Sequence, residues 1–272
     1  MLDLPLNIDY TGKTVVITGA GGVLCAEMVK AFAQSGARVA ALDLNEDAVR
    51  RLADELKNEG LECTGYKANV LDAEALEEVH KSVLAKYGPC DILINGAGGN
   101  NPKATTDNEY QHEARPGQKT FFELDVAGVD FVFRLNFQGS LIPAQVFAKD
   151  MVERRSGNIL NISSMNAYTP LTKIPAYSGA KAAISNFTQW LATYFARSGI
   201  RCNAIAPGLI NTESEVADYD DEFMQMELDK ILVRRIGEAS EVAHLVKFLI
   251  SDEASYINNS IIRIDGGQYS SN

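Results

Sequence analysis

Seven short runs of apolar or β-branched residues recur along this chain of 272 residues, and longer stretches with helical spacing separate them. Several, such as residues 15–17 and 92–94, are apolar at consecutive positions, as strands buried on both faces require. The alternation of strands and helices predicts a doubly wound parallel α/β sheet of about seven strands with helices on both faces. No repeat or linker occurs, so we expect one domain over residues 1–272. The predicted strands are 14–18, 38–43, 62–69, 91–95, 158–163, 201–206 and 260–264.

Two segments are too long to be ordinary connections. Residues 96–120 are polar and rich in Asn, Gly and Thr, whereas residues 211–230 are acidic with a few large apolar side chains. Long loops of compact α/β domains usually cover or bind a ligand, so we expect a substrate loop at 96–120 and a lid at 211–230. A surface insertion without a role is the alternative for each.

The charge balance narrows the class of partner. There are 25 Lys and Arg against 36 Asp and Glu, a net charge of −11, so the chain lacks the surplus of cations with which proteins bind nucleic acid. The four cysteines form no CxxC pair and have no His at zinc-ligand spacing, which predicts buried free thiols and no metal site. The sequence shows neither a signal peptide nor a long apolar run, so we expect a cytoplasmic protein without a membrane partner.

A glycine-rich turn follows the first predicted strand. It reads Thr18-Gly19-Ala20-Gly21-Gly22, and a helix begins near Val23. Glycines allow a tight turn and close approach of the backbone to a pyrophosphate, which the first N–H groups of the helix then bind. Leu24 stands where the third glycine of a GxGxxG pattern falls, so a helix cap without a ligand remains an alternative.

Asp43 closes the second predicted strand. A carboxylate there can accept hydrogen bonds from the adenosine ribose hydroxyls, and it repels a 2′-phosphate. Leu44 follows it, and the glycine turn offers no cation, so NAD is favoured over NADP. The alternative role for Asp43 is an N-cap of the next helix, which Asn45 could fill instead.

Tyr177 and Lys181 are four residues apart, which places them one turn apart on the same face of a helix. A tyrosine hydroxyl has a pKa of about 10, too high for a base near neutral pH. A neighbouring ammonium group favours the phenolate and lowers this pKa. The string YxxxK is common, so an exposed helix pair is the alternative when it is taken alone. Ser164 lies thirteen residues before Tyr177.

Together these motifs resemble the short-chain dehydrogenase/reductase family, and the resemblance covers nearly the whole chain. It implies a Rossmann-type fold and hydride transfer between nicotinamide and a carbinol carbon. The matching positions are the TGAGG turn (18–22), Asp43, Asn69-Val70, Asn95-Gly96-Ala97-Gly98, Asn136, Ser164, the YSGAK segment (177–181), Pro207-Gly208 and Asp265-Gly266-Gly267.

The resemblance also implies the roles of individual residues. Tyr177 is the general acid/base, and Ser164 hydrogen-bonds the reacting oxygen. Lys181 binds the nicotinamide ribose and lowers the pKa of Tyr177, while Asn136 holds a water that continues the proton relay. The implied cofactor contacts are Gly19, Gly21, Gly22, Val23, Leu24, Asp43, Leu44, Asn69, Val70, Asn95, Ala97, Gly98, Tyr177, Lys181, Pro207, Gly208, Ile210 and Thr212.

Four positions depart from the family pattern. Val23 and Cys25 stand where TGxxxGxG has glycine, which affects the close packing of helix on strand but not the Gly19 turn. Asn69 replaces a commoner Asp, and Gly96 replaces the second Asn of NNAG. None of these positions belongs to the proton-transfer residues.

Residues 96–111 and 163–192 resemble the sugar-acid subgroup of this family, the D-mannonate oxidoreductases or short-chain fructuronate reductases. This implies the NAD-dependent interconversion of D-mannonate and D-fructuronate. The alternatives are another short-chain dehydrogenase, such as a gluconate or polyol dehydrogenase or an oxoacyl reductase, and a nucleotide sensor without catalysis. A polyol carboxylate needs several hydrogen-bond partners and a cation. Candidate substrate contacts are Asn100, Asn101, Lys103, His112, Arg115, Asn166 and Lys173.

Eight carboxylates and no Lys or Arg lie between residues 213 and 229. Such a lid would disfavour an anionic substrate unless its carboxylates face solvent.

Residues 126–151 and 176–197 are apolar around much of their helical circumference, although one apolar stripe is enough to cover a sheet. The second apolar face predicts burial against another copy, in agreement with the dimers and tetramers of the family, so we expect a homotetramer or homodimer.

Overall fold

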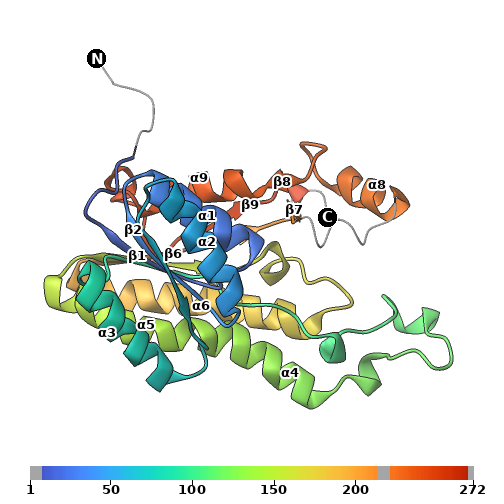
Figure 1. Cartoon of the computed structure of the whole chain (residues 1–272). Helices are drawn as coiled ribbons and strands as arrows, with labels where there is room; N and C mark the ends of the chain where they lie inside the picture. Colours follow the sequence, from blue (N-terminus) through green and yellow to red (C-terminus); the bar gives the residue numbers. More distant parts are fainter. Residues whose placement is uncertain (1–7, 213–220, 269–272) are drawn as a thin grey trace.

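Seven parallel strands form the central sheet of the computed structural model, which describes residues 8–212 and 221–268 except for the side chains of 221–223. The strand order is β3-β2-β1-β4-β5-β6-β9, so the direction of winding reverses between β1 and β4 (Figure 1). All seven predicted strands are confirmed, with ends displaced by two residues at most. They are β1 (Thr14–Thr18), β2 (Arg38–Asp43), β3 (Cys63–Lys67), β4 (Ile92–Asn95), β5 (Gly157–Ile162), β6 (Ile200–Pro207) and β9 (Ile261–Ile264).

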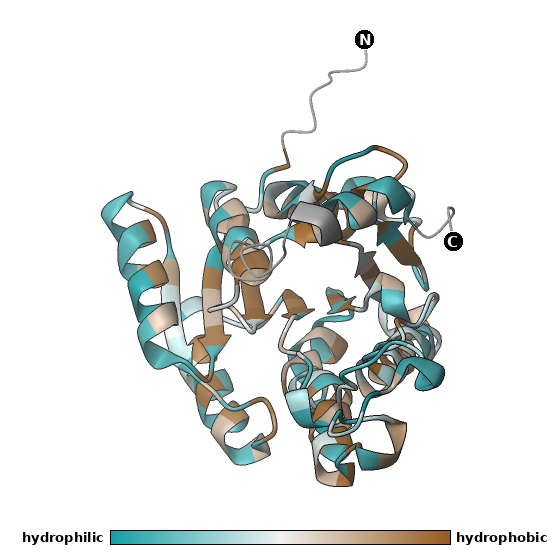
Figure 2. Cartoon of the chain, turned by 90° about the vertical axis from the view of Figure 1, so that its right-hand side faces the viewer, coloured by the Kyte–Doolittle hydropathy of each residue, from teal (hydrophilic) through white to brown (hydrophobic). Residues whose placement is uncertain are grey.

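Helices cover both faces of this sheet, as the apolar runs predict. In β1, Val15 and Ile17 pack into one core, and Val16 packs into the core on the opposite face. The apolar sides of the helices accordingly face the strands in the end-on view (Figure 2). The helices of the first face are α1 (Val23–Gln34), α2 (Glu46–Asn58) and α9 (Ala239–Ile250), and those of the second are α3 (Ala73–Tyr87), α5 (Gly139–Arg154) and α6 (Pro175–Phe195).

The helix expected over residues 126–151 is interrupted. It consists of α4 (Val126–Phe133), a π-helical turn (Arg134–Gln138) and α5. Inside the turn, the side-chain amide of Asn136 donates to the carbonyl oxygen of Val132 at 2.8 Å. A side chain that bonds the carbonyl four residues earlier competes with regular helical hydrogen bonding, and π-helical turns often lie at functional sites.

The two long segments leave the sheet on the side of its carboxyl-terminal strand ends. The first forms an arm that projects from the body and contains the short 3-10 turns Pro102–Ala104, Gln111–Glu113 and Phe121–Glu123 (Figure 1). The second begins with β7 (Ile210–Asn211), which pairs with β8 (Gly237–Glu238), and includes α8 (Asp221–Lys230). Residues 213–220 of the expected lid lie outside the described residues. No described helix combines the length and apolarity needed to cross a bilayer.

Candidate active site

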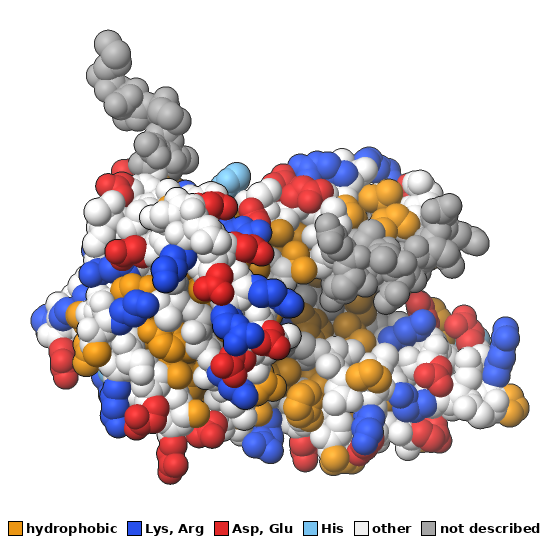
Figure 3. Space-filling view, viewed as in Figure 1, with side chains coloured by type: hydrophobic (Ala, Val, Ile, Leu, Met, Phe, Trp, Pro, Cys, Tyr) orange, Lys and Arg blue, Asp and Glu red, His pale blue; other side chains and the backbone are white. Residues whose placement is uncertain are grey.

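A cavity of about 820 Å³ lies beyond the carboxyl ends of the central strands. Its walls include the residues that follow β1, β4, β5 and β6. The space-filling view shows a hollow between the body and the projecting arm (Figure 3). Open α/β sheets bind ligands at such a point, where the strand order reverses.

The turn after β1 fits a dinucleotide pyrophosphate. Gly19 has a φ of +69°, and a Cβ atom there would lie 2.8 Å from the backbone nitrogen of Ala97, so only glycine fits. Gly22 is the N-cap of α1 and provides no capping side chain. The first N–H groups of α1 are therefore available to an anion at the edge of the cavity, which Gly22 and Val23 line.

Asp43 is held over this turn by two backbone N–H groups. Its Oδ2 accepts a hydrogen bond from Gly21 at 2.9 Å, and its Oδ1 accepts one from Asn45 at 2.8 Å. Asn45 is the N-cap of α2, since its side chain accepts from the N–H of Ala48. The alternative role for Asp43 as that cap is thus wrong. Its carboxylate lines the cavity, where it can accept hydrogen bonds from a ribose.

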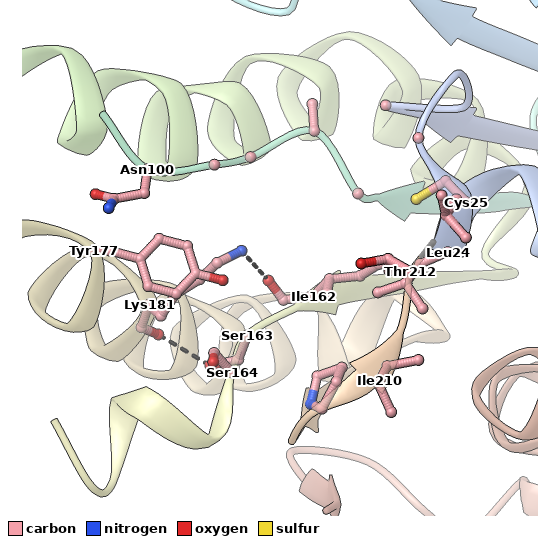
Figure 4. A pocket seen from close by; sticks show the side chains of 18 of the residues that line it. Leu24, Cys25, Asn100, Ile162, Ser163, Ser164, Tyr177, Lys181, Ile210 and Thr212 are labelled. Carbon is pink, nitrogen blue, oxygen red and sulfur yellow. Dashed lines mark hydrogen bonds between the residues drawn. The ribbon is translucent and has the colours of Figure 1, made fainter. Parts of the chain in front are cut away.

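Tyr177 and Lys181 lie on α6 and face the cavity (Figure 4). The Lys181 Nζ lies 5.5 Å from the centroid of the Tyr177 ring and donates to the carbonyl oxygen of Ile162 at 2.8 Å. Burial lowers the pKa of Lys181 from 10.5 to about 8. Lys181 is therefore mainly protonated at neutral pH and places a positive charge beside Tyr177.

Ser164 follows β5 and faces the same cavity. It is buried, and its Oγ accepts a hydrogen bond from the N–H of Asn166 at 3.2 Å, which leaves the hydroxyl proton for donation. Asn166 is 8% exposed and also lines the cavity. Its Oδ1 has no hydrogen-bond partner among the described residues. A buried polar atom in this state calls for a partner in a bound ligand or water.

Asn136 lies behind the cavity wall. Its Nδ2 donates to the carbonyl oxygen of Gly99 at 2.8 Å, and its Oδ1 accepts from the N–H of Gly99 at 3.3 Å. A Cβ atom on Gly98 would lie 2.6 Å from Asn136 Oδ1 and 3.1 Å from Lys181 Nζ. The amide of Asn136 and the ammonium of Lys181 thus border the same space beside Gly98, which stays open only because residue 98 has no side chain.

The geometry agrees with the comparisons with known proteins. The sequence pattern of the family described as short chain dehydrogenase matches residues 13–222. The chain belongs to this family. The resemblance inferred from the motifs is thereby confirmed.

Three relatives show how far the similarity extends. A protein of Haemophilus influenzae described as an uncharacterized oxidoreductase is 50% identical over 274 residues, which cover 98% of this chain and 96% of its own. A solved structure from the same species, provisionally assigned as a D-mannonate oxidoreductase with bound NAD, is 50% identical with a TM-score of 0.93 over 97% of each chain. A 7α-hydroxysteroid dehydrogenase complexed with NADH and 7-oxo glycochenodeoxycholic acid is 30% identical, with a TM-score of 0.86 over 96% of each chain.

Most of the family positions that the sequence singles out are gathered around the cavity. Gly21, Asn95 and Asn136 are among the exceptions: the Gly21 N–H is bonded to Asp43, the buried Asn95 amide donates to Asn161, and Asn136 lies behind the wall on Gly99. The family positions that line the cavity are Gly19, Gly22, Val23, Leu24, Asp43, Leu44, Asn69, Val70, Gly96, Ala97, Gly98, Ser164, Tyr177, Lys181, Pro207, Gly208, Ile210 and Thr212. The substrate candidates Asn100 and Asn166 line it as well.

The expected substrate cations are not among them. Lys103 has 72% of its side chain exposed, and its Nζ lies 3.9 Å from Asp125 Oδ2. The side chain of Lys173 is also exposed, and its backbone carbonyl accepts a hydrogen bond from the N–H of Thr106. Asn101 turns back to accept from the N–H of Lys103. Lys103 and Asn101 belong to the arm, and the arm projects away from the body (Figure 1). His112 and Arg115 are exposed farther along the same segment of the sequence. Among the described lining residues, Lys181 is the one Lys or Arg.

The structure adds lining residues that the motifs do not indicate. Glu227 on α8 and Gln268 near the C-terminus both line the cavity, and the Gln268 Nε2 donates to Glu227 Oε2 at 3.1 Å. Lys230 lies 2.6 Å from the other oxygen of Glu227. The sequence indicates these two residues only indirectly: Glu227 belongs to the expected acidic lid, and Gln268 directly follows the family positions Gly266-Gly267. Among the described residues no three His, Cys, Asp or Glu side chains are grouped to hold a metal ion.

Proposed function

We propose that this chain is an NAD-dependent oxidoreductase that interconverts D-mannonate and D-fructuronate. The observation that carries the reaction class is the convergence of Ser164, Tyr177 and Lys181 on one cavity beside the glycine turn. The 50% identity to a structure provisionally assigned as a D-mannonate oxidoreductase with bound NAD supports the substrate and the cofactor. A gluconate or polyol dehydrogenase or an oxoacyl reductase is the alternative within the family. A sensor without catalysis is disfavoured because it needs neither Ser164 nor Tyr177.

Bound NAD would supply the hydride acceptor at its nicotinamide ring. The Ser164 hydroxyl donates a hydrogen bond to the substrate oxygen and positions it. Tyr177 accepts the hydroxyl proton when the alcohol is oxidised and returns a proton to the carbonyl oxygen in the reverse direction. The ammonium of Lys181 stabilises the tyrosinate electrostatically, and the amide of Asn136 holds the Gly98–Gly99 wall beside it.

The preference for NAD over NADP rests on Asp43. Its two backbone hydrogen bonds fix the carboxylate in the cavity wall, where it accepts from ribose hydroxyls and repels a phosphate. Leu44, the next lining residue, adds no positive charge to offset that repulsion. The adenosine end of the site therefore favours two free hydroxyls.

The substrate end favours a hydroxylated chain. Asn166 presents a buried Oδ1 without a described partner, and Glu227 and Gln268 form a polar wall. Placing an apolar ring system against Asn166 would leave its buried Oδ1 without a hydrogen bond, at a cost of about 1–3 kcal/mol, and would bring apolar surface against the charged Glu227. A polyhydroxylated acid offers donors and acceptors to all three. We therefore favour a sugar acid over a steroid, although one relative is a 7α-hydroxysteroid dehydrogenase complexed with 7-oxo glycochenodeoxycholic acid.

We further propose that the chain assembles as a homotetramer or homodimer through α4 and α6. In the single chain the outer side of these helices leaves Phe131, Phe133, Trp190 and Tyr194 between 40% and 65% exposed. Trp190 stacks on Tyr194 with ring centroids 4.8 Å apart, which forms a broad apolar surface. We expect the enzyme to act in the cytoplasm, where its four free buried cysteines stay reduced. Sedimentation as a monomer at micromolar concentration would contradict the assembly.

The proposal is tested by following NADH formation with a panel of hexonates, neutral polyols and hydroxysteroids. We expect D-mannonate to give the highest kcat/KM. Tyr177→Phe should lower kcat at least about 1,000-fold with the Kd for NAD unchanged. Tyr168→Phe, a tyrosine nearby in sequence but not among the lining residues, is the matched control and should retain activity. Near-normal turnover of Tyr177→Phe would refute the mechanism, and preference for a steroid would refute the substrate class.

A further inference from the structure

Two positions that depart from the family pattern lie in direct contact. Cys25 stands on α1 where the family has glycine, and Gly96 follows β4 where the family has asparagine. A Cβ atom on Gly96 would lie 2.2 Å from Cys25 Sγ, far inside the shortest real contact. The Cys25 side chain thus occupies the space beside residue 96 that any larger residue there would need. Cys25 and Gly96 both line the cavity, and the close-up shows the Cys25 side chain next to that of Leu24 (Figure 4).

The same contact lies between two backbone turns that build the cofactor end of the cavity. Thr18 Oγ1 accepts hydrogen bonds from the N–H groups of Gly96 at 3.1 Å and Ala97 at 3.3 Å. Gly19 approaches so closely that a Cβ atom there would lie 2.8 Å from the nitrogen of Ala97. A displacement of Gly96 must therefore move the turn that binds the pyrophosphate.

Cys25 acts here as a small apolar group. It is 4% exposed, and burial raises the pKa of its thiol to about 12, so it carries no charge at neutral pH. Its volume exceeds that of the glycine of the family pattern, while Gly96 lacks the side chain of the family asparagine. At this one contact, Cys25 therefore adds side-chain volume relative to the family pattern and Gly96 removes it.

We propose that Cys25 and Gly96 are a matched pair of positioning residues that sets the separation of the Gly19 and Gly96 turns and thereby the affinity for NAD. The inference rests on the proposed use of NAD. It assigns to the pair no part in proton transfer. Its effect therefore appears in the binding of the cofactor and in the KM for NAD, while kcat at saturating NAD stays within about threefold.

The test is a double-mutant cycle read by isothermal titration calorimetry with NAD. Gly96→Ala overfills the contact and should raise the Kd about 30-fold, the middle of the range for overpacking. Cys25→Ala removes Sγ and should change the Kd less than about threefold. In the double variant the Sγ clash is absent and the 2.8 Å approach to the Thr18 carbonyl oxygen remains. We expect it to recover at least half of the loss on a logarithmic scale.

Cys202→Ala is the matched control. Cys202 is fully buried in β6 and does not line the cavity, so its loss should lower Tm without changing the Kd for NAD. If Gly96→Ala does not fold, Cys25→Leu overfills the same contact from the helix side and should raise the Kd in its place. A double variant that binds no better than Gly96→Ala, or overfilled variants that bind NAD normally, would overturn the proposal. The Kd for NAD is measured directly by calorimetry. Failure to oxidise any sugar acid would therefore contradict the proposed substrate but leave the test of the Cys25–Gly96 pair valid.

Discussion

Replacing Lys181 with methionine should stabilise the cofactor-free fold while removing activity. Lys181 is 4% exposed, and burial lowers its pKa from 10.5 to about 8. At 1.36 kcal/mol for each pKa unit, holding the ammonium inside the folded chain costs about 3 kcal/mol relative to the neutral amine. Methionine avoids this cost. It also leaves the carbonyl of Ile162 without its donor, which lowers the stability by about 1–2 kcal/mol. We expect a net gain of about 1–2 kcal/mol in the free energy of unfolding at pH 7.

The pH dependence distinguishes this explanation from simple repacking. Below pH 8 Lys181 is protonated in the folded and the unfolded chain, and the desolvation cost is present in full. Between pH 8 and 10.5 the folded chain binds fewer protons than the unfolded chain, so the stability of the natural protein rises with pH. The free energy of unfolding of Lys181→Met should therefore fall by up to about 3 kcal/mol relative to that of the natural protein over this interval. The natural protein should become the more stable of the two.

Urea unfolding at pH 7 and at pH 10, followed by circular dichroism without NAD, measures both quantities. Lys57→Met is the matched control, because Lys57 is exposed on α2 and its ammonium is already in water. It should change stability little and by a similar amount at both values of pH. The reasoning is refuted if Lys181→Met is less stable than the natural protein at pH 7 and the difference between them does not vary with pH.

Three further outcomes follow from the site. Asp43→Ser should lower kcat/KM for NAD about 30-fold, because two charged hydrogen bonds to ribose are lost, and should not lower that for NADP; steady-state kinetics with both cofactors decide this, and a parallel loss with both would contradict it. Asn136→Ala should lower the free energy of unfolding by about 2 kcal/mol and reduce kcat, since the Gly99 and Val132 bonds disappear; an unchanged urea midpoint would count against it. Glu227→Gln should lower the KM for a hexonate, because it removes a negative charge from the wall beside an anionic substrate, while the Kd for NAD stays constant; a change in the Kd for NAD alone would show that Glu227 does not face the substrate.

The sequence predicts the sheet well because its strands are buried on both faces. Val15, Val16 and Ile17 are apolar at consecutive positions, which is typical of a central strand covered on both faces, and all three are fully buried. The catalytic pair is predicted for a local reason, since four residues of helix place Tyr177 and Lys181 on one face whatever surrounds them. β7 and β8 contain two residues each, too few for any periodicity, and therefore are not predicted.

The rest depends on contacts between distant segments. The π-helical turn at Asn136 arises from side-chain bonds to Val132 and to Gly99, which is 37 residues away in sequence. The exposure of Lys103 follows from the direction of a long arm, which composition does not specify. The pairing of Cys25 with Gly96 joins positions on α1 and after β4, and only the folded geometry shows that the two departures meet.

The net charge of −11 suggests that the acidic lid repels an anionic substrate, but this depends on which lid carboxylates face the cavity. Of the lid carboxylates with described side chains, Asp229 pairs with Arg234 at 3.0 Å, and Glu227 faces the cavity with Lys230 at 2.6 Å. Glu227 therefore brings a compensated charge, and it need not exclude an anion. Because Lys181 is the one described cation in the lining and is committed to Tyr177, a sugar-acid carboxylate must be held mainly by neutral donors such as the Asn166 amide. Neutral donors discriminate a carboxylate from a hydroxyl far less than an ion pair does. If D-mannonate is the substrate, its selection over neutral polyols must come from the number and placement of hydrogen bonds.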